Sequence, residues 1–393
     1  MECRLKLDVG WQHLLWTIFG RAADTRSSSV ANASLVRIGE EKRCVNALSV
    51  RTLFDGILTL LPGKRGDTII MSAINIRDMF EIAQSHGYNV QVVDVDPRTL
   101  LPPPGALLRA HLESEAKICV ISHLFGAISS LEDAAELHRR GVFIIEDMAQ
   151  SFCKQRQIGD QSADCTLLSF GPIKRYSALG GAIGLFRDKN IASGIADLLH
   201  SYPQSSDAWF RKRGLKYIGL KAMSLPLPYA VLLKALRMFG RDIDGSIGGL
   251  ARGFANQELH HAIRYQPPTR MLQLMTKRLV ADSDEETRQA VCQSVVAALH
   301  PEMVKIGQKA EGHGYWLFPI TTKQPERTIK LLRSKGFDAT SGATSLCVGD
   351  KHAAPNAVRL LEECVYVPNP ADMTAGKRKR MIAALQSLAS VHN

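Results

Sequence analysis

Two residues of this sequence could together bind and activate a cofactor. Asp147 ends the apolar run Phe143-Ile-Ile-Glu-Asp, and Lys174 follows a second apolar run that ends at Ser169. A lysine that forms a Schiff base and an acid that keeps a pyridine nitrogen protonated are the two groups that pyridoxal phosphate (PLP) requires from a protein. The pair therefore predicts a PLP site.

Neighbouring polar residues support this interpretation. Ser169 is close enough in sequence to Lys174 to offer a hydroxyl to the cofactor phosphate, and Gln150 could hydrogen-bond the phenolic oxygen of the ring. A lone lysine after a strand is usually a surface residue, and a lone aspartate at a strand end is usually a helix cap. The occurrence of all four side chains in one short stretch favours a site.

The elements that position these residues alternate between strand and helix. Uninterrupted apolar runs predict strands at 68–71, 90–93, 117–122, 142–145, 165–169 and 182–186. Strands without polar alternation, separated by helices, indicate an α/β fold with a mainly parallel central sheet covered on both faces. Ligands of such sheets bind beyond the carboxyl ends of the strands, so Asp147 and Lys174 are expected in one pocket.

The chain divides into two expected domains. Residues 1–265 form a large PLP-binding domain, within which 190–265 is a basic, apolar and largely helical region. Residues 266–393 form a smaller C-terminal α+β domain.

Composition excludes several classes of protein. The 393 residues are 45% hydrophobic and 22% charged, and no apolar run is long enough to span a membrane. The apolar residues near the N-terminus do not indicate a secretory signal. The eight cysteines form no Cys-x-x-Cys pair, so neither a metal site nor a disulfide framework is expected and the cytoplasm is the predicted location.

Positive charge raises the question of partners. The net charge is +11. We favour a solvated basic surface over a nucleic-acid-binding surface, and no nucleic-acid partner is expected. The segment from Leu215 to Phe239 mixes apolar and basic residues. It could line a hydrophobic entrance or lie on an anionic membrane surface, but an ordinary helical cover of the large domain is favoured.

Several motifs resemble the DegT/DnrJ/EryC1/StrS family, the sugar aminotransferases of PLP fold type I. The resemblance covers residues 45–190 well and 310–388 more loosely. The motifs are Glu146-Asp-Met-Ala-Gln150, Ser169-Phe-x-x-x-Lys174 with the following Gly-Gly, Gly66-Asp67-Thr-Ile-Ile, Val93-Asp-Val-Asp-Pro97, His123-Leu-Phe-Gly126 and Val367-Pro368-Asn-Pro.

This resemblance implies a role for each matching residue. Lys174 is the Schiff-base lysine and the proton shuttle, Asp147 pairs with the pyridine nitrogen, Gln150 lies beside the ring, and Ser169 binds the phosphate. It also implies a homodimer in which each active site is completed by the partner, with glutamate or glutamine as donor and a keto-sugar nucleotide as acceptor.

The sequence departs from the family pattern around the acceptor pocket. The usual Ser-Gly-Thr turn reads Ser49-Val-Arg-Thr52, where Arg51 or Thr52 could still bind phosphate. The segment Ser72-Ala-Ile-Asn75 lacks the ring-facing aromatic residue, and Asn256 is the candidate for the residue that reaches the partner's site. These differences indicate a divergent substrate.

The expected function is a PLP-dependent aminotransferase acting on a keto-sugar nucleotide or another specialised-metabolite ketone or aldehyde. Two alternatives stay open: a PLP-dependent lyase, dehydratase or cyclisation enzyme on the same scaffold, and a non-catalytic regulator that kept the fold.

Overall fold

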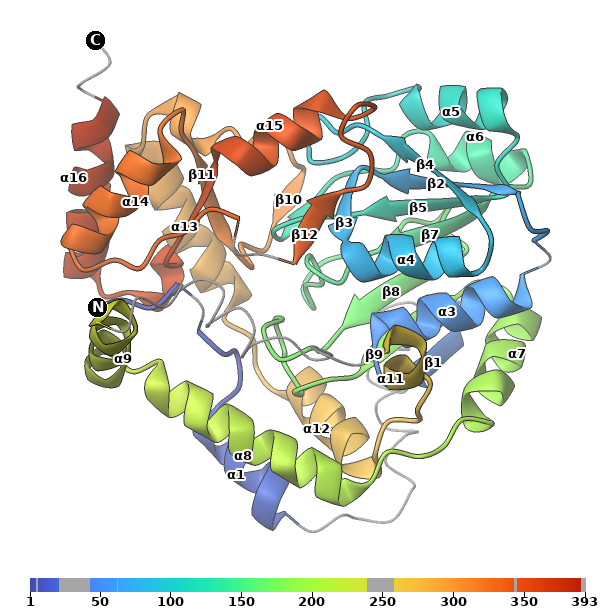
Figure 1. Cartoon of the computed structure of the whole chain (residues 1–393), viewed down its shortest axis with the longest axis horizontal. Helices are drawn as coiled ribbons and strands as arrows, with labels where there is room; N and C mark the ends of the chain where they lie inside the picture. Colours follow the sequence, from blue (N-terminus) through green and yellow to red (C-terminus); the bar gives the residue numbers. More distant parts are fainter. Residues whose placement is uncertain (5, 21–42, 62, 239–257, 343–344, 390–393) are drawn as a thin grey trace.

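The computed structural model describes the whole chain except residues 5, 21–42, 62, 239–257, 343–344 and 390–393. Figure 1 shows a central sheet with helices on the right, a smaller lobe on the left, and a helical layer below.

Seven strands form the central sheet. Their spatial order is β1 (Arg43–Ala47), β9 (Ala182–Phe186), β8 (Cys165–Ser169), β7 (Phe143–Asp147), β5 (Ile118–Ser122), β2 (Thr68–Ser72) and β4 (Asn89–Val93). β9 runs antiparallel to both of its neighbours, and the pairs from β8 to β4 are parallel. The predicted mainly parallel sheet is confirmed.

Helices cover both faces of this sheet. One face packs against α3 (Val50–Leu60), α4 (Arg77–Ser85) and α7 (Lys189–His200), and the other against α5 (Ala106–Ser114) and α6 (Ala134–Arg139). Successive residues of β2 alternate between these faces: Ile69 and Met71 belong to the first core, and Ile70 to the second. Burial on both sides explains why the strands read as continuous apolar runs.

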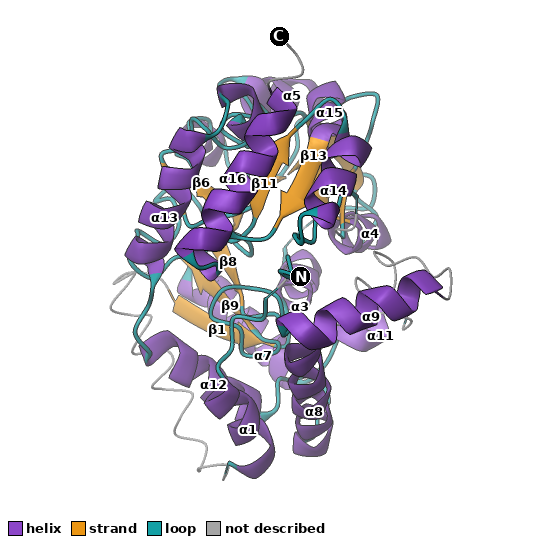
Figure 2. Cartoon of the chain, turned by 90° about the vertical axis from the view of Figure 1, so that its left-hand side faces the viewer, coloured by secondary structure: helices purple, strands orange, loops and turns teal. Residues whose placement is uncertain are grey.

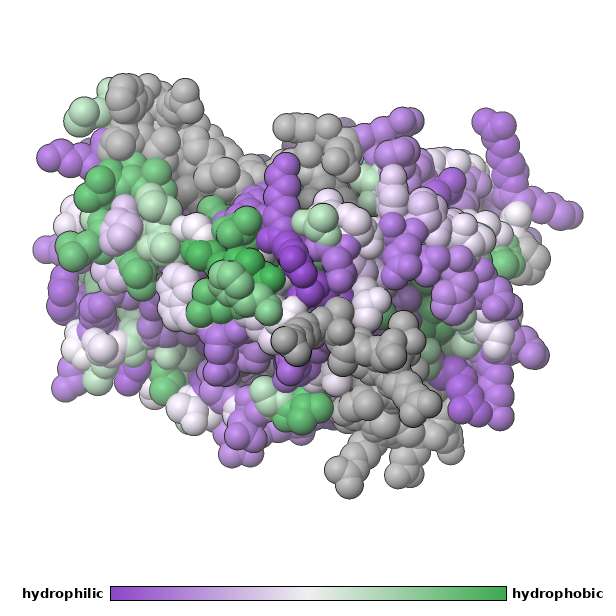
Figure 3. Space-filling model, turned by 90° about the horizontal axis from the view of Figure 1, so that it is seen from below, coloured by the Kyte–Doolittle hydropathy of each residue, from purple (hydrophilic) through white to green (hydrophobic). Residues whose placement is uncertain are grey.

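A third group of helices lies below the sheet (Figure 2). It comprises α1 (Trp11–Phe19), α8 (Asp207–Met223), α9 (Pro226–Met238), α11 (Leu259–Ile263) and α12 (Thr269–Val280). Pro226 begins α9 and does not break it, because a proline at the first helical position lacks only an N–H that has no helical partner there. Seen from below, the molecule exposes hydrophobic side chains among hydrophilic ones (Figure 3).

The C-terminal lobe has a core of its own. Its elements are α13 (Glu285–Ala298), η1 (Pro301–Val304), β11 (Phe318–Thr321), α14 (Pro325–Ser334), α15 (Pro355–Glu363), β13 (Cys364–Val367), η2 (Pro370–Asp372) and α16 (Ala375–Ala389). The core of the lobe extends from Cys292 to Leu385 but does not include α15, whose Ala357 and Leu360 pack with the central sheet, as do Met271 and Met275 of α12. The domain boundary at 265/266 stays a prediction.

Two small strand pairs connect the lobes. β3 (Ile74–Ile76) pairs with β12 (Leu346–Val348), and β6 (Ala127–Ile128) pairs with β10 (Gly312–His313). Both β3 and β6 follow strands of the central sheet, so C-terminal segments lie beside the carboxyl edge. In the described part of the chain, no helix has the length and apolarity needed to cross a membrane.

Candidate active site

The carboxyl edge of the central sheet collects the predicted site residues. Asp147 ends β7 and Ser169 ends β8, and these strands are parallel neighbours in which Asp147 pairs in register with Leu167. Lys174 lies on the loop after β8. A Cβ atom built on Gly171 would lie 3.4 Å from Ser169 Oγ and 3.5 Å from Lys174 Cγ, so these two side chains flank the same glycine.

Lys174 and Asp147 perturb each other's ionisation. Burial lowers the pKa of Lys174 to about 7, against the opposing effect of the Asp147 carboxylate. Burial raises the pKa of Asp147, and the positive charge of Lys174 acts against that rise. The two side chains therefore lie in one electrostatic environment, as the sheet topology predicts for groups at neighbouring strand ends.

Backbone and side-chain contacts hold Asp147 in place. Its Oδ1 accepts a hydrogen bond from the N–H of Ala149 at 2.9 Å, and its carbonyl accepts one from the N–H of His123 at 3.0 Å. His123 is itself buried, with Nε2 2.9 Å from Oε1 of Glu146. The carboxylate that would meet a ring nitrogen is thus rigidly supported.

The N-terminus of α3 lies at the same edge, because β1 runs in the direction of β8 and α3 follows it. Ser49 caps this helix and accepts a hydrogen bond from the N–H of Thr52 at 3.2 Å. The positive charge of Arg51 lowers the pKa of both Asp147 and Lys174, although Arg51 also pairs with Asp78. A helix N-terminus with an arginine is suited to an anion such as phosphate.

The remaining predicted residues differ in their placement. The hydroxyl of Thr52 is buried and donates to the carbonyl of Ile263 at 2.8 Å. Gln150 is half-buried, and its Oε1 accepts a hydrogen bond from the N–H of Phe125 at 3.2 Å. Asn256 lies outside the described residues. The roles assigned to these residues stay predictions.

Sequence reasoning missed Trp316, on the segment between β10 and β11. The Nζ of Lys174 lies 3.8 Å from the centroid of its ring, and its indole N–H donates to the carbonyl of Ile173 at 2.7 Å. The C-terminal lobe thus supplies an aromatic face to the lysine. No spacing in the sequence links residues so far apart.

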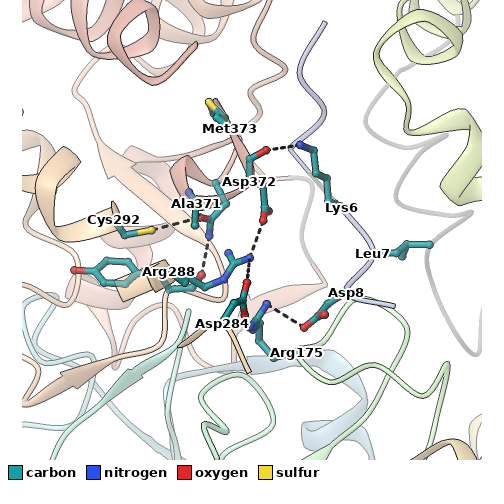
Figure 4. Close-up of polar contacts among 12 residues, drawn as sticks. Lys6, Leu7, Asp8, Arg175, Asp284, Arg288, Cys292, Ala371, Asp372 and Met373 are labelled. Carbon is teal, nitrogen blue, oxygen red and sulfur yellow. Dashed lines mark hydrogen bonds and ion pairs between the residues drawn. The ribbon is translucent and has the colours of Figure 1, made fainter. Parts of the chain in front are cut away.

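Arg175 ties the lysine loop to two other parts of the chain (Figure 4). It pairs with Asp8 at 3.0 Å and with Asp284, just before α13, at 2.5 Å. Asp284 lies 3.8 Å from Arg288, which pairs with Asp372 at 2.7 Å. This ion network connects the loop of Lys174 with the N-terminal segment and the C-terminal lobe.

The glycine pair after the lysine loop is explained by close packing. Gly180 and Gly181 have φ of +156° and +92°. A Cβ on Gly181 would lie 2.3 Å from Sδ of Met275, and one on Gly180 would lie 2.6 Å from Cε of Met271. The pair therefore lets α12 approach the loop.

The donor set fits PLP. It combines a lysine whose pKa is lowered toward neutrality, a carboxylate whose pKa is raised by burial, a serine hydroxyl and a helix N-terminus with an arginine. The mainly parallel sheet with its one antiparallel strand has the architecture of PLP-dependent aminotransferases of fold type I.

One sequence comparison matches a known family. A sequence model of the DegT/DnrJ/EryC1/StrS aminotransferase family matches residues 53–237 of the chain. The resemblance expected from the motifs is confirmed. No curated protein matches the chain by sequence.

Three solved structures show how widely the fold is shared. The sugar aminotransferase CalS13 of Micromonospora echinospora is 16% identical with a TM-score of 0.65, covering 98% of this chain and 100% of its own. The aminotransferase TlmJ of Streptoalloteichus hindustanus is 15% identical with a TM-score of 0.68, covering 100% of both chains. Helicobacter pylori PseC, an aminotransferase of pseudoaminic acid biosynthesis, is 11% identical with a TM-score of 0.68, covering 98% of each chain.

Proposed function

We propose that this protein transfers the amino group of an amino acid, glutamate or glutamine, to the carbonyl carbon of a keto-sugar nucleotide or a related specialised metabolite. The observation that carries the proposal is the mutual perturbation of Lys174 and Asp147 at one edge of the sheet. The sugar acceptor is supported by the family and by the printed descriptions of CalS13 and PseC.

PLP, when bound, supplies an electron sink that stabilises negative charge at the reacting carbon. Lys174 would hold the cofactor and then move a proton through Nζ, for which a pKa near neutrality is suited. Asp147, as an anion, would keep the ring nitrogen protonated. Ser169, Arg51 and the N-terminus of α3 would hold the phosphate.

The net reaction balances without an external oxidant. In the net reaction, the amino group and one hydrogen of the donor carbon are exchanged for the oxygen of the acceptor carbonyl, so the donor becomes a 2-oxo acid and the acceptor an amine. The proton removed from the donor carbon and the proton added to the acceptor carbon both pass through one base, for which Lys174 is the candidate.

The test begins with the cofactor and needs no acceptor. Purified protein is mixed with PLP and then with single amino acids, and the visible absorption of the bound cofactor is followed. We expect a lysine-bound band that is lost on addition of glutamate or glutamine, with release of 2-oxoglutarate from glutamate.

Lys174→Ala should abolish the band and reduce transfer by at least about 100-fold, because the group that moves the proton is removed. Lys330→Ala, at an exposed position of α14, is the matched control and should keep both. Product formation without any 2-oxo acid would favour a lyase, dehydratase or cyclisation enzyme. Salt-sensitive DNA binding without PLP uptake would favour a regulator.

We also propose a homodimer in the cytoplasm. The dimer rests on the family resemblance, and the location is supported by eight free cysteines. Light scattering of the purified protein should give twice the mass of the 43.2 kDa chain.

A further inference from the structure

The paired helices α8 and α9 carry positive charge without negative charge. Between Ala208 and Met238 the sequence contains no aspartate or glutamate. Arg211, Lys212, Lys216 and Lys234 are exposed there. The described residues form no ion pair with these four side chains.

Helix α9 is apolar on two opposite faces. On the inner face, Tyr229 is buried against Cys3 and donates a hydrogen bond to Oδ2 of Asp338 at 2.5 Å. On the outer face, Leu227, Val231 and Met238 are 80%, 69% and 73% exposed. Their spacing places them along one stripe, which Lys234 completes. An exposed apolar stripe of this kind indicates an interaction surface.

The exposed apolar surface continues onto neighbouring elements. Met223 and Leu225 are exposed at the junction of α8 and α9, and Leu215 is exposed on α8. Adjacent α1 exposes Trp11, Leu15 and Phe19, and Lys221 lies over the Trp11 ring at 5.8 Å. Figure 3 shows hydrophobic and hydrophilic side chains interspersed over this side of the molecule.

We name the exposed side chains of α8 and α9 the basic apolar face. It consists of Leu215, Met223, Leu225, Leu227, Val231 and Met238 with Arg211, Lys212, Lys216 and Lys234.

We propose that the basic apolar face lies on an anionic lipid bilayer, with its apolar side chains among the acyl chains and its basic side chains at the phosphates. Helices with this combination bind membrane surfaces by apolar burial together with attraction to anionic lipids. Tryptophan near such a face is typical of the membrane interface. This inference is independent of the proposed amino transfer.

A second copy of the chain is a poorer occupant. A two-fold interface places the same surface of each copy against the other. The basic apolar face would then meet itself, so its unopposed positive charges would repel each other across the interface. An anionic surface complements the charge instead.

The test is co-sedimentation of the full-length protein with vesicles. One set contains phosphatidylcholine alone, and the other contains phosphatidylcholine with phosphatidylglycerol. We expect binding to the mixed vesicles, weaker binding to the neutral ones, and loss of the difference at high salt because exposed charges are then screened.

Two kinds of variant separate the contributions. Leu227→Glu with Val231→Glu should reduce partitioning into mixed vesicles by about tenfold or more, because two apolar side chains no longer enter the bilayer. Lys212→Ala with Lys216→Ala should weaken only the additional binding that the anionic lipid provides. Leu112→Glu, at an exposed leucine of α5 on the far side of the molecule in Figure 1, should change nothing.

Circular dichroism of each variant checks the fold, and the lysine variants keep the test valid should the glutamate pair disturb α9. Wild-type protein that stays in solution with both vesicle sets would overturn the proposal, as would equal binding to both. If the wild-type protein does not bind vesicles and the glutamate variant is a monomer where the wild type is a dimer, the basic apolar face is instead an interface between two subunits.

Discussion

At the scale of single residues, the chemistry of the site depends on how burial shifts the pKa values of Lys174 and Asp147. Neither ion is well solvated at the sheet edge. The N–H of Ala149 and the charge of Lys174 stabilise the Asp147 anion, and Asp147 in turn stabilises the Lys174 cation. A bound pyridinium would replace the ammonium as the partner of Asp147 once Lys174 is committed to the cofactor. The site thus favours a cationic ring.

The pH dependence of cofactor capture follows from this pairing. Capture requires the neutral amine, so the rate at which the apo-protein takes up PLP should rise through pH about 7, well below the range of an ordinary lysine. The Asp147 carboxylate raises the pKa of Lys174, so Asp147→Asn should move the midpoint to lower pH. Stopped-flow absorbance across a pH series measures both, and a wild-type midpoint near that of free lysine would refute the assignment.

Trp316 donates a hydrogen bond that a phenylalanine at this position cannot make. Trp316→Phe retains an aromatic ring but leaves the carbonyl of Ile173 without its donor, which should lower the free energy of unfolding by about 1 kcal/mol. Trp209→Phe, at an exposed position of α8, is the control and should stay within about 0.5 kcal/mol of wild type. Urea titrations compare the two; equal losses would argue against the hydrogen bond.

At the scale of elements, the lysine loop is held by contacts outside the sheet. Asp8 pairs with Arg175 and also accepts the N–H of Tyr176 at 3.0 Å. Arg278 of α12 pairs with the same aspartate at 2.7 Å. The N-terminal segment therefore joins the lysine loop to α12.

The two partners of Arg175 should differ in importance. Asp8→Asn should lower the free energy of unfolding by about 1–2 kcal/mol. The Asp8 side chain is only 27% exposed, and the substitution removes its ion pairs with Arg175 and Arg278. Asp284→Asn should cost less than about 1 kcal/mol, since that side chain is 61% exposed. Chemical denaturation gives both values, and a larger loss at Asp284 would contradict this order.

At the scale of the whole molecule, the site lies where the two lobes meet. The sheet supplies Asp147 and Lys174, while the C-terminal lobe supplies Trp316 and the ion pair from Asp284. A ligand bound here would contact both lobes and stabilise the native chain as a unit.

PLP should therefore raise the stability of the entire protein. At a concentration of about 100 times Kd, binding to the native state alone adds about 2.7 kcal/mol, which appears as an increase in Tm. Pyridoxine, which has neither the aldehyde nor the phosphate, is the matched ligand control and should leave Tm nearly unchanged. In Lys174→Ala, PLP should raise Tm only by the amount that its non-covalent contacts provide. Equal shifts with both ligands would show that neither group is recognised.

The sequence by itself determined the parallel strands, the order of the site residues along them, and the family. Apolar runs buried on both faces are visible in one dimension, and topology then requires neighbouring strand ends to meet. The limits of these runs were close to the observed strands, as at 165–169 and 182–186.

Only the tertiary structure decided which distant residues complete the site and which surfaces stay exposed. The antiparallel direction of β9, the approach of Trp316 to Lys174, the ion network of Arg175 and the bare outer stripe of α9 all depend on packing between segments far apart in the chain. Local spacing specifies periodicity but not partners, because the free energy of such contacts arises only when the chain has folded.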